Sequence, residues 1–119
     1  EGENLLYLPQ AKVYHRSCSI GPWVRVGATE AEAREWAIEI QIERGGETVF
    51  EGTVSVNQIK RSFGELRDFM FQSQVFPFGC ALLTGTGIVP DDDFTLKEGD
   101  TVSIHISGIG CLNNPVVRV

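Results

Sequence analysis

The sequence predicts a β-rich α+β domain with one main helix at about 57–72. Two stretches alternate between apolar and polar residues, and one repeats its apolar residues every three to four positions. Thirteen glycines and five prolines place turns throughout the chain. The regular alternation of strands and helices that marks a parallel sheet is missing. The 119 residues therefore fit a single domain, 1–119.

The region before the first alternating stretch has the weakest periodicity. Short apolar runs favour strands at 11–14 and 23–26. Thr29 is followed three residues later by Glu32, which is the spacing of a capping box. A short helix is therefore expected to begin at this point.

The next segment predicts a β-hairpin. Residues 37–43 alternate strictly, as a half-buried strand does. Its apolar residues share one face: Ile38, Ile40 and Ile42. Gly45 and Gly46 supply the two positive-φ positions of a tight turn. We expect 48–54 to return as the antiparallel partner strand.

The main helix is predicted from an apolar stripe with spacings of 4, 3 and 4 residues. The stripe consists of Ile59, Phe63, Leu66 and Met70. Asn57 is the expected N-cap, because its side chain can accept a hydrogen bond from the first helical turn. The helix is expected to end near Gln72.

The last third of the chain returns to β structure. A short apolar run favours a strand at 80–84, and 97–100 has the composition of a turn. Residues 101–107 alternate again, and a final strand is expected at 116–119. The predicted inward residues of the alternating stretch are Val102, Ile104 and Ile106.

Composition and charge exclude several classes of function. Ten basic and sixteen acidic residues give a net charge of −6, unlike a general nucleic-acid binder or a protein held on an anionic membrane. No apolar run approaches the ~20 residues of a membrane helix. The three cysteines are widely spaced, and no pair has the spacing of a zinc site. A reducing, cytoplasmic location is expected, without nucleic-acid or membrane partners.

A Thr-Gly-Thr-Gly loop at 84–87 is the first candidate for chemistry. Its glycines let a ligand approach the backbone, so that successive N–H groups can cradle a carboxylate or an oxyanion. The hydroxyl of Thr86 adds a donor. A tight turn without a ligand has the same residue pattern, so both interpretations stay open.

Lys12 is the second candidate, because it lies in a largely apolar stretch beside Tyr14. Such a lysine can bind an anionic substrate or polarise a carbonyl. A surface lysine on an edge strand explains the same pattern.

Other polar clusters favour structural roles. His15 and Cys18 do not make a metal site, and the Asp run at 91–93 lacks the Gly and Glu offsets of a calcium loop. Cys80 and Cys111 lie beside apolar residues and are expected in the core. The two tryptophans, Trp23 and Trp36, are expected as core or subunit-interface anchors.

Several stretches together resemble the fumarylacetoacetate hydrolase family. They are Leu-Pro-Gln-Ala-Lys at 8–12, Thr-Gly-Thr-Gly-Ile-Val-Pro at 84–90, Leu-Lys-Glu-Gly-Asp at 96–100 and Leu-Asn-Asn-Pro at 112–115. Their order and spacing are similar to the C-terminal half of that family's catalytic domain. The residues of the first two motifs are most similar to those of the branch that contains 2-keto-3-deoxy sugar-acid dehydratases and diketo-deoxy sugar-acid hydrolases.

The resemblance implies a mixed β-roll and a homo-oligomer, a dimer or a tetramer. It implies Mg²⁺ (or Ca²⁺ or Mn²⁺) held by a Glu-x-Glu pair and an Asp upstream of this chain. The implied substrate is a 2-oxo or diketo acid that reacts through a metal-stabilised enolate. The implied reaction is C–C bond hydrolysis or dehydration of a 2-keto-3-deoxy sugar acid. A missing N-terminal half is then an expected partner, and this chain alone is expected to be inactive.

The resemblance carries over to a few residues. Lys12 matches a lysine that contacts substrate and assists acid–base steps, and Gly85 and Thr86 match the substrate-binding turn. Glu1 falls near a substrate-side position, and no metal ligand is expected within the chain. The His-Arg pair at 15–16 departs from the usual Asp or Gly, which alters the expected polarity of the pocket.

Two further interpretations stay open. One is a catalytically inactive β-roll fragment that serves only assembly or binding, because the expected metal carboxylates are missing. The other is an acidic protein-interaction module of an unrelated family.

Overall fold

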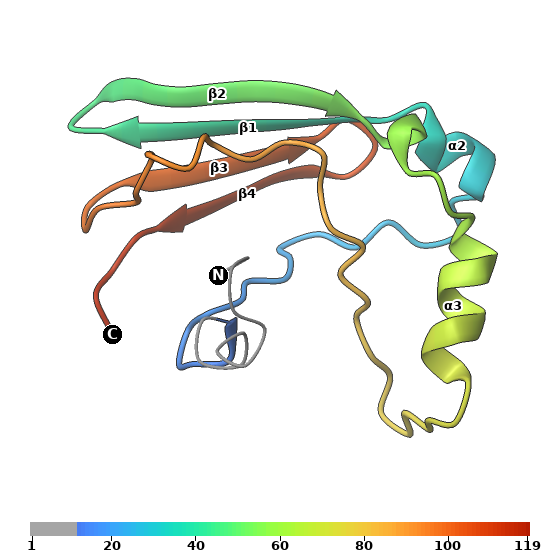
Figure 1. The fold of residues 1–119 in the computed structure, drawn as a ribbon. Helices are drawn as coiled ribbons and strands as arrows, with labels where there is room; N and C mark the ends of the chain where they lie inside the picture. The colour runs from blue at the N-terminus through green and yellow to red at the C-terminus, as the bar shows by residue number, and fades with distance from the viewer. Residues whose placement is uncertain (1–11) are drawn as a thin grey trace.

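The computed structural model describes residues 12–119, and its centre is a four-stranded antiparallel sheet of order β2-β1-β3-β4 (Figure 1). Two short α-helices and a 3₁₀ turn lie at one end of this sheet (Figure 1). In chain order the elements are α2 (Glu30–Arg34), β1 (Ala37–Arg44), β2 (Glu47–Ser55), η2 (Val56–Gln58), α3 (Phe63–Phe71), β3 (Thr101–Ile106) and β4 (Gly110–Pro115). The predicted β-rich α+β class is confirmed.

The hairpin of β1 and β2 forms as its sequence pattern predicts. Gly45 and Gly46 both have positive φ, 60° and 86°, which the tight turn requires. A β-bulge interrupts the register between Ile42 and Glu43. Strand β3 then pairs with the other side of β1, so the most regular strand lies inside the sheet.

One face of the sheet is apolar, because the inward residues of β1 and β3 meet across the register. Ile38, Ile40 and Ile42 oppose Ile106, Ile104 and Val102. The connection between α3 and β3 crosses this face (Figure 1), and it brings the Phe94 ring to 5.9 Å from Phe50. The opposite face is polar, with His105 Nδ1 3.5 Å from the Glu39 carboxylate.

The capping box at Thr29 is confirmed and begins α2. The Thr29 hydroxyl accepts from the Glu32 backbone N–H at 3.2 Å, and the Glu32 carboxylate accepts from the Thr29 N–H at 2.7 Å. These hydrogen bonds, the backbone bond first, lower the pKa of Glu32 below its ordinary value.

Arg34, at the end of α2, fixes the chain between η2 and α3. Its guanidinium donates to the carbonyls of Ile59 at 2.8 Å and Arg61 at 2.9 Å. It also pairs with Glu30 at 2.7 Å, and Glu30 in turn accepts from the Phe63 backbone N–H. The pKa of Glu30 is lowered chiefly by the hydrogen bond from Arg34. Residues 59–63 are therefore tied to α2.

The predicted helix at 57–72 is shorter than expected. Helix α3 begins at Phe63, and the Ser62 hydroxyl caps it by accepting from the Glu65 N–H at 3.0 Å. Asn57 lies inside η2 and is not the cap of α3, while Ile59 has extended backbone angles. The bonds of Arg34 to carbonyls of 59 and 61 hold this stretch outside the helix.

Several predicted strands are absent from the structure at residues 12–119. Lys12 is helical and 13–16 form a turn, with Arg16 at φ 61° and the Ser17 N–H donating to the Tyr14 carbonyl. The stretches 23–26 and 80–84 are irregular. The last strand is β4, not 116–119, because the turn after β3 closes within three residues.

Two cysteines are less buried than predicted, while a subunit-interface role of the two tryptophans stays a prediction. Cys80 and Cys111 are both exposed, so their placement in the core was wrong. Trp36 is half-buried against Gly108, and Trp23 is exposed but lies over Gly110, where a Cβ would be 3.0 Å from the ring. Among residues 12–119, no helix has the length and apolarity needed to cross a bilayer.

An ion pair between a buried aspartate and a half-buried arginine joins the end of β1 to the turn before β3. Asp100 is 1% exposed, and both its oxygens accept from the Arg44 guanidinium at 2.8 Å. Asp100 also accepts from the Lys97 N–H at 2.8 Å, which closes the predicted turn at 97–100. The hydrogen bond from Arg44 contributes most to lowering the pKa of Asp100, to about 2.

Replacing Ile42 by Ala is expected to destabilise the protein by about 2–5 kcal/mol, since a nearly filled position on the apolar face would become a cavity. Ile42 is 2% exposed. Urea unfolding measures the change. Glu51→Ala on the exposed polar face is the control, with an expected change within about 0.5 kcal/mol. Equal effects of the two variants would contradict the assigned faces.

Asp100→Asn is expected to remove part of the acid sensitivity of the fold. Because folding lowers the pKa of Asp100 from 3.8 to about 2, its stabilisation is present above about pH 4 and is lost as the pH falls through about 2. The variant should be less stable at neutral pH, and the difference from wild type should shrink between about pH 4 and 2. Urea midpoints at several pH values test this; a constant difference would refute it.

Candidate functional site

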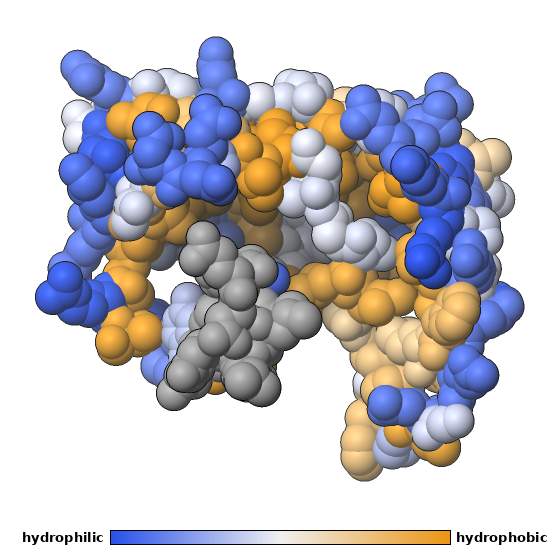
Figure 2. All heavy atoms as spheres, in the orientation of Figure 1, coloured by the Kyte–Doolittle hydropathy of each residue, from blue (hydrophilic) through white to orange (hydrophobic). Residues whose placement is uncertain are grey.

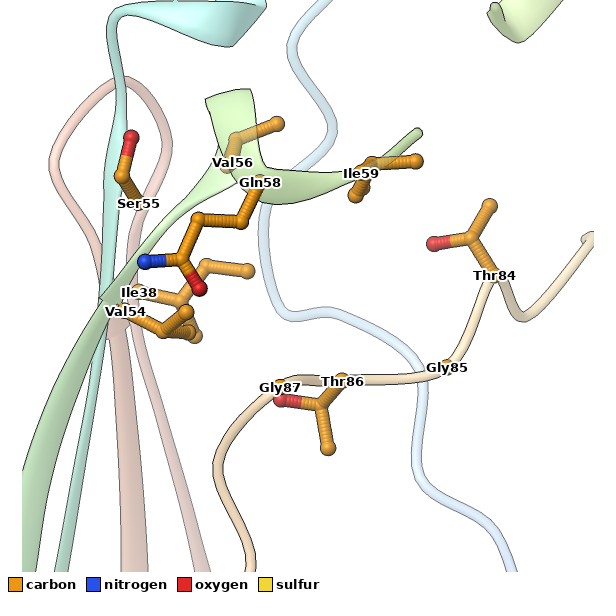
Figure 3. Close-up of a pocket in the computed structure, with 10 residues that line it drawn as sticks. All are labelled: Ile38, Val54, Ser55, Val56, Gln58, Ile59, Thr84, Gly85, Thr86 and Gly87. Atoms are coloured by element: carbon orange, nitrogen blue, oxygen red, sulfur yellow. The ribbon is translucent and has the colours of Figure 1, made fainter. Parts of the chain in front are cut away.

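The Thr-Gly-Thr-Gly loop lines a pocket of about 300 Å³ beside the end of β2 (Figure 3). This volume is at the lower end of the ~300–1,000 Å³ typical of ligand pockets, so a small molecule fits better than a large cofactor. The lining residues are Ile38, Val54, Ser55, Val56, Gln58, Ile59, Thr84, Gly85, Thr86 and Gly87. Thr84 to Gly87 form one wall, and β2 with η2 forms the other (Figure 3).

The wall formed by η2 is fixed by its backbone. Val56 is buried, and its N–H donates to the Trp36 carbonyl at 3.0 Å. The Ser55 hydroxyl caps the turn by accepting from the Asn57 N–H at 3.2 Å. Together with the bonds from Arg34, these contacts set the position from which the Gln58 side chain enters the pocket.

The loop packs closely against β2 because two glycines at the contact have no side chain. Gly52 has no Cβ, and the Ile88 side chain fills the space that a Cβ there would need. A Cβ at Gly87 would lie 3.2 Å from Val54 Cγ2, so the backbone of the loop approaches the strand closely. The loop is therefore seated directly on the sheet.

The loop presents hydrogen-bond donors to the pocket. The Thr86 hydroxyl accepts from the Ile88 backbone N–H at 3.2 Å, which leaves its own hydrogen available to donate. Gly85 has φ +80°, a left-handed conformation that glycine adopts without steric cost. A donor hydroxyl beside accessible backbone amides suits the oxygens of a carboxylate or a carbonyl.

The predicted site residues fall into three groups. Gly85 and Thr86 lie together in the pocket. Lys12 is exposed on the N-terminal segment and lies outside the set of residues that line this pocket. Glu1 lies outside the described residues. The convergence of Lys12 with the loop stays a prediction.

The sequence prediction missed the contribution of Gln58 and Ile59. Both lie within the predicted main helix at 57–72, and a polar residue at position 58 of such a helix is expected to face solvent. The Ser at 55 and the Ser at 62, each a good N-cap, are the signal that two separate turns begin here.

No group of three or more His, Cys, Asp or Glu residues that could hold a metal ion occurs within 12–119. The residues of this part of the chain therefore do not fit a metal centre of their own. No chemical step through a metal is derived from them.

The fold is that of a known class. Residues 3–117 match the family model described as "Fumarylacetoacetate (FAA) hydrolase C-terminal", so the chain belongs to this family. The resemblance found in the sequence motifs is thereby confirmed.

Two curated relatives are similar to the chain along nearly all of its length. The chain is 44% identical over 119 residues to "Probable 2-keto-3-deoxyxylonate dehydratase" of Haloferax volcanii, covering all of this chain and 41% of that protein. It is 40% identical over 118 residues to "2-dehydro-3-deoxy-D-arabinonate dehydratase" of Saccharolobus solfataricus, covering 99% and 40%. The chain thus spans about two fifths of the length of the curated relatives it matches.

Solved structures agree with this assignment. The fold matches 2-keto-3-deoxy-D-arabinonate dehydratase complexed with magnesium and 2,5-dioxopentanoate, with a TM-score of 0.89 and 39% identity, covering 95% of this chain and 40% of that chain. The apo form of 2-keto-3-deoxy-D-arabinonate dehydratase matches with a TM-score of 0.90 and 39% identity, covering 98% and 42%. The α+β fold is therefore that of the family's C-terminal domain.

Gly85→Ala is expected to destabilise the protein by about 1–2 kcal/mol, because the left-handed conformation is costly for a residue with a Cβ. A Cβ at position 85 would meet no atom within 4 Å, so the cost is conformational and not steric. Gly85→Asn is the matched variant and should cost less, since Asn tolerates this region. Chemical denaturation of both variants measures it; equal costs would count against a conformational origin.

Proposed function

We propose that this chain forms one wall of the active site of a metal-dependent dehydratase that acts on a 2-keto-3-deoxy sugar acid. The observation that carries the proposal is the seated Gly85–Thr86 loop with a donor hydroxyl in a small pocket. Support comes from the two dehydratases that the chain resembles along nearly its whole length. These names favour dehydration over C–C bond hydrolysis.

The proposed substrate binds through its oxygens. The Thr86 hydroxyl and the backbone N–H groups of 85–87 donate to the carboxylate or the 2-oxo group. Lys12, an exposed cation on the N-terminal segment, is proposed to move toward this end of the substrate, bind it and assist proton transfer. Glu1 is proposed only as a substrate-side neighbour.

Mg²⁺ is proposed as the cofactor of the complete enzyme, by analogy with the relative solved with magnesium. It would supply Lewis-acid stabilisation of enolate charge. Its ligands are proposed to lie in sequence that this chain does not span, since the described residues offer no suitable cluster. The residues of this chain bind and orient the substrate.

Exposed apolar side chains at residues 63–83 support the proposal that another part of the enzyme binds this chain. The arm formed by residues 63–83 extends away from the sheet (Figure 1) and is rich in apolar surface (Figure 2). Its exposed hydrophobic residues are Phe69, Phe71, Val75, Phe78, Leu82 and Leu83, with Phe78 100% exposed. Apolar patches of this kind mark interaction surfaces. We propose that an N-terminal half of the same enzyme covers part of it, in a homo-oligomer.

The alternative is a catalytically inactive fragment that serves only assembly or binding. The lack of a metal cluster in the described residues is the observation that favours it. Activity after the missing half is supplied separates the two proposals.

In a protein that contains both halves, Thr86→Val is expected to lower kcat/KM by about 10²-fold, since a single lost donor to a reacting oxyanion costs roughly this much. Lys12→Met is expected to lower it at least as far. The assay follows dehydration of 2-keto-3-deoxypentonates with Mg²⁺.

Thr53→Val is the matched control, because Thr53 is exposed on the polar face of the sheet. Its rate should stay within about twofold of wild type. Full activity of both the Thr86 and the Lys12 variants would refute the roles proposed for them. No turnover by the complete wild-type protein would favour the inactive alternative.

A further inference from the structure

We propose that Gln58 is a specificity-determining residue that binds the C5 oxygen of a five-carbon 2-keto-3-deoxy acid, an inference that rests on the proposed function. Gln58 faces the Thr-Gly-Thr-Gly loop from the opposite wall of the pocket (Figure 3). It would select substrates by the end of the molecule remote from the carboxylate.

The position of Gln58 is fixed from three sides. It is the last residue of η2, whose first residue, Val56, is buried and bonded to the Trp36 carbonyl at 3.0 Å. The next residue, Ile59, accepts from the Arg34 guanidinium at 2.8 Å and donates its N–H back to Val56. The backbone of Gln58 is therefore already ordered, so that binding a ligand restricts only its exposed side chain.

The amide of Gln58 points into the pocket with its hydrogen-bonding groups unused. Figure 3 shows it in the space between η2 and the loop, and its Oε1 lies 3.7 Å from the position of a Cβ on Gly87. Among residues 12–119, no side chain or backbone group hydrogen-bonds to this amide. The oxygen and both N–H groups are therefore available to a ligand.

The other polar side chain on this wall, Ser55, directs its hydroxyl away from the loop (Figure 3). The Ser55 hydroxyl accepts from the Asn57 N–H at 3.2 Å, as the cap of η2. The remaining lining residues of β1, β2 and η2 are apolar: Ile38, Val54, Val56 and Ile59. The hydroxyls of Thr84 and Thr86 belong to the loop, on the other side. Gln58 is thus the polar side chain on this wall that can hydrogen-bond to the end of the ligand opposite the loop.

The chemistry of the amide selects the kind of oxygen. A carboxylate is served best by cations and by convergent N–H groups, which the loop and Lys12 are proposed to provide. A neutral amide offers a donor and an acceptor side by side, which suits a hydroxyl, and its N–H₂ suits a carbonyl. One residue can therefore hold an alcohol oxygen before reaction and an aldehyde oxygen after it.

The relatives supply compounds with this pattern. 2,5-Dioxopentanoate, bound in one relative, is a keto-deoxypentonate less one water, and its C5 oxygen is kept as an aldehyde. With the carboxylate and 2-oxo group at the loop, C5 is the part of the chain directed toward Gln58. The five-carbon acid is small enough for a pocket of about 300 Å³.

The test compares two ligands that differ at C5, in a protein containing both halves and Mg²⁺. They are 5-hydroxy-2-oxopentanoate and 2-oxopentanoate, which are identical except for the C5 oxygen, and both are assayed as competitive inhibitors. Turnover of 2-keto-3-deoxyarabinonate is measured as kcat/KM. Gln58→Met keeps the size of the side chain and removes its hydrogen bonds. It should lower kcat/KM and weaken inhibition by 5-hydroxy-2-oxopentanoate at least tenfold each, because the C5 oxygen loses its hydrogen-bond partner. The inhibition constant of 2-oxopentanoate should change less than twofold.

Gln41→Met is the matched control, since Gln41 is exposed on the polar face of the sheet, and no constant should change. If Gln58→Met does not fold, Gln58→Ala gives the same comparison. Equal losses for both ligands, or no loss for the pentonate, would overturn the role of Gln58 alone. A wild-type protein that does not dehydrate the pentonate would overturn the proposed function and this inference with it.

Discussion

The ion pair between Arg44 and Asp100 is the constraint on which the arrangement of the sheet depends. It joins the last residue of β1 to the residue before β3, 56 positions apart in the chain. Arg44 also donates to the Thr95 carbonyl at 3.0 Å, so the same guanidinium holds the connection that leads into β3. A buried pair of this kind adds little net stability over apolar groups, but it penalises any register that separates its partners. It therefore determines where the long connection returns to the sheet.

That connection is also what builds the pocket. It leaves α3, passes the loop at 84–87 and crosses the apolar face before it reaches Asp100 (Figure 1). Arg34 holds the chain that leads into α3, and Asp100 holds the end of the connection where it enters β3. Regular elements thus position a short loop, which is the usual way in which binding residues are held on a scaffold.

Local patterns predicted the parts of the fold that depend on neighbours in sequence. The capping box at Thr29 and the Gly45–Gly46 hairpin formed as expected, because both are satisfied by groups a few residues away. The start of the main helix was misplaced, because Arg34 binds carbonyls 25 and 27 residues later. Motifs singled out Gly85 and Thr86, which line the pocket, whereas the place of Gln58 depends on the serine caps at 55 and 62 together with the distant contacts of Arg34 and Trp36.

The seating of Ile88 over Gly52 couples two distant positions of the chain. The space that the absent Cβ leaves on β2 is filled by the isoleucine that follows the binding loop. A larger side chain at one position requires a smaller one at the other, since close-packed interiors contain little empty space. Among related sequences, residues 52 and 88 should therefore vary as a compensating pair, small with large, wherever the loop keeps its place.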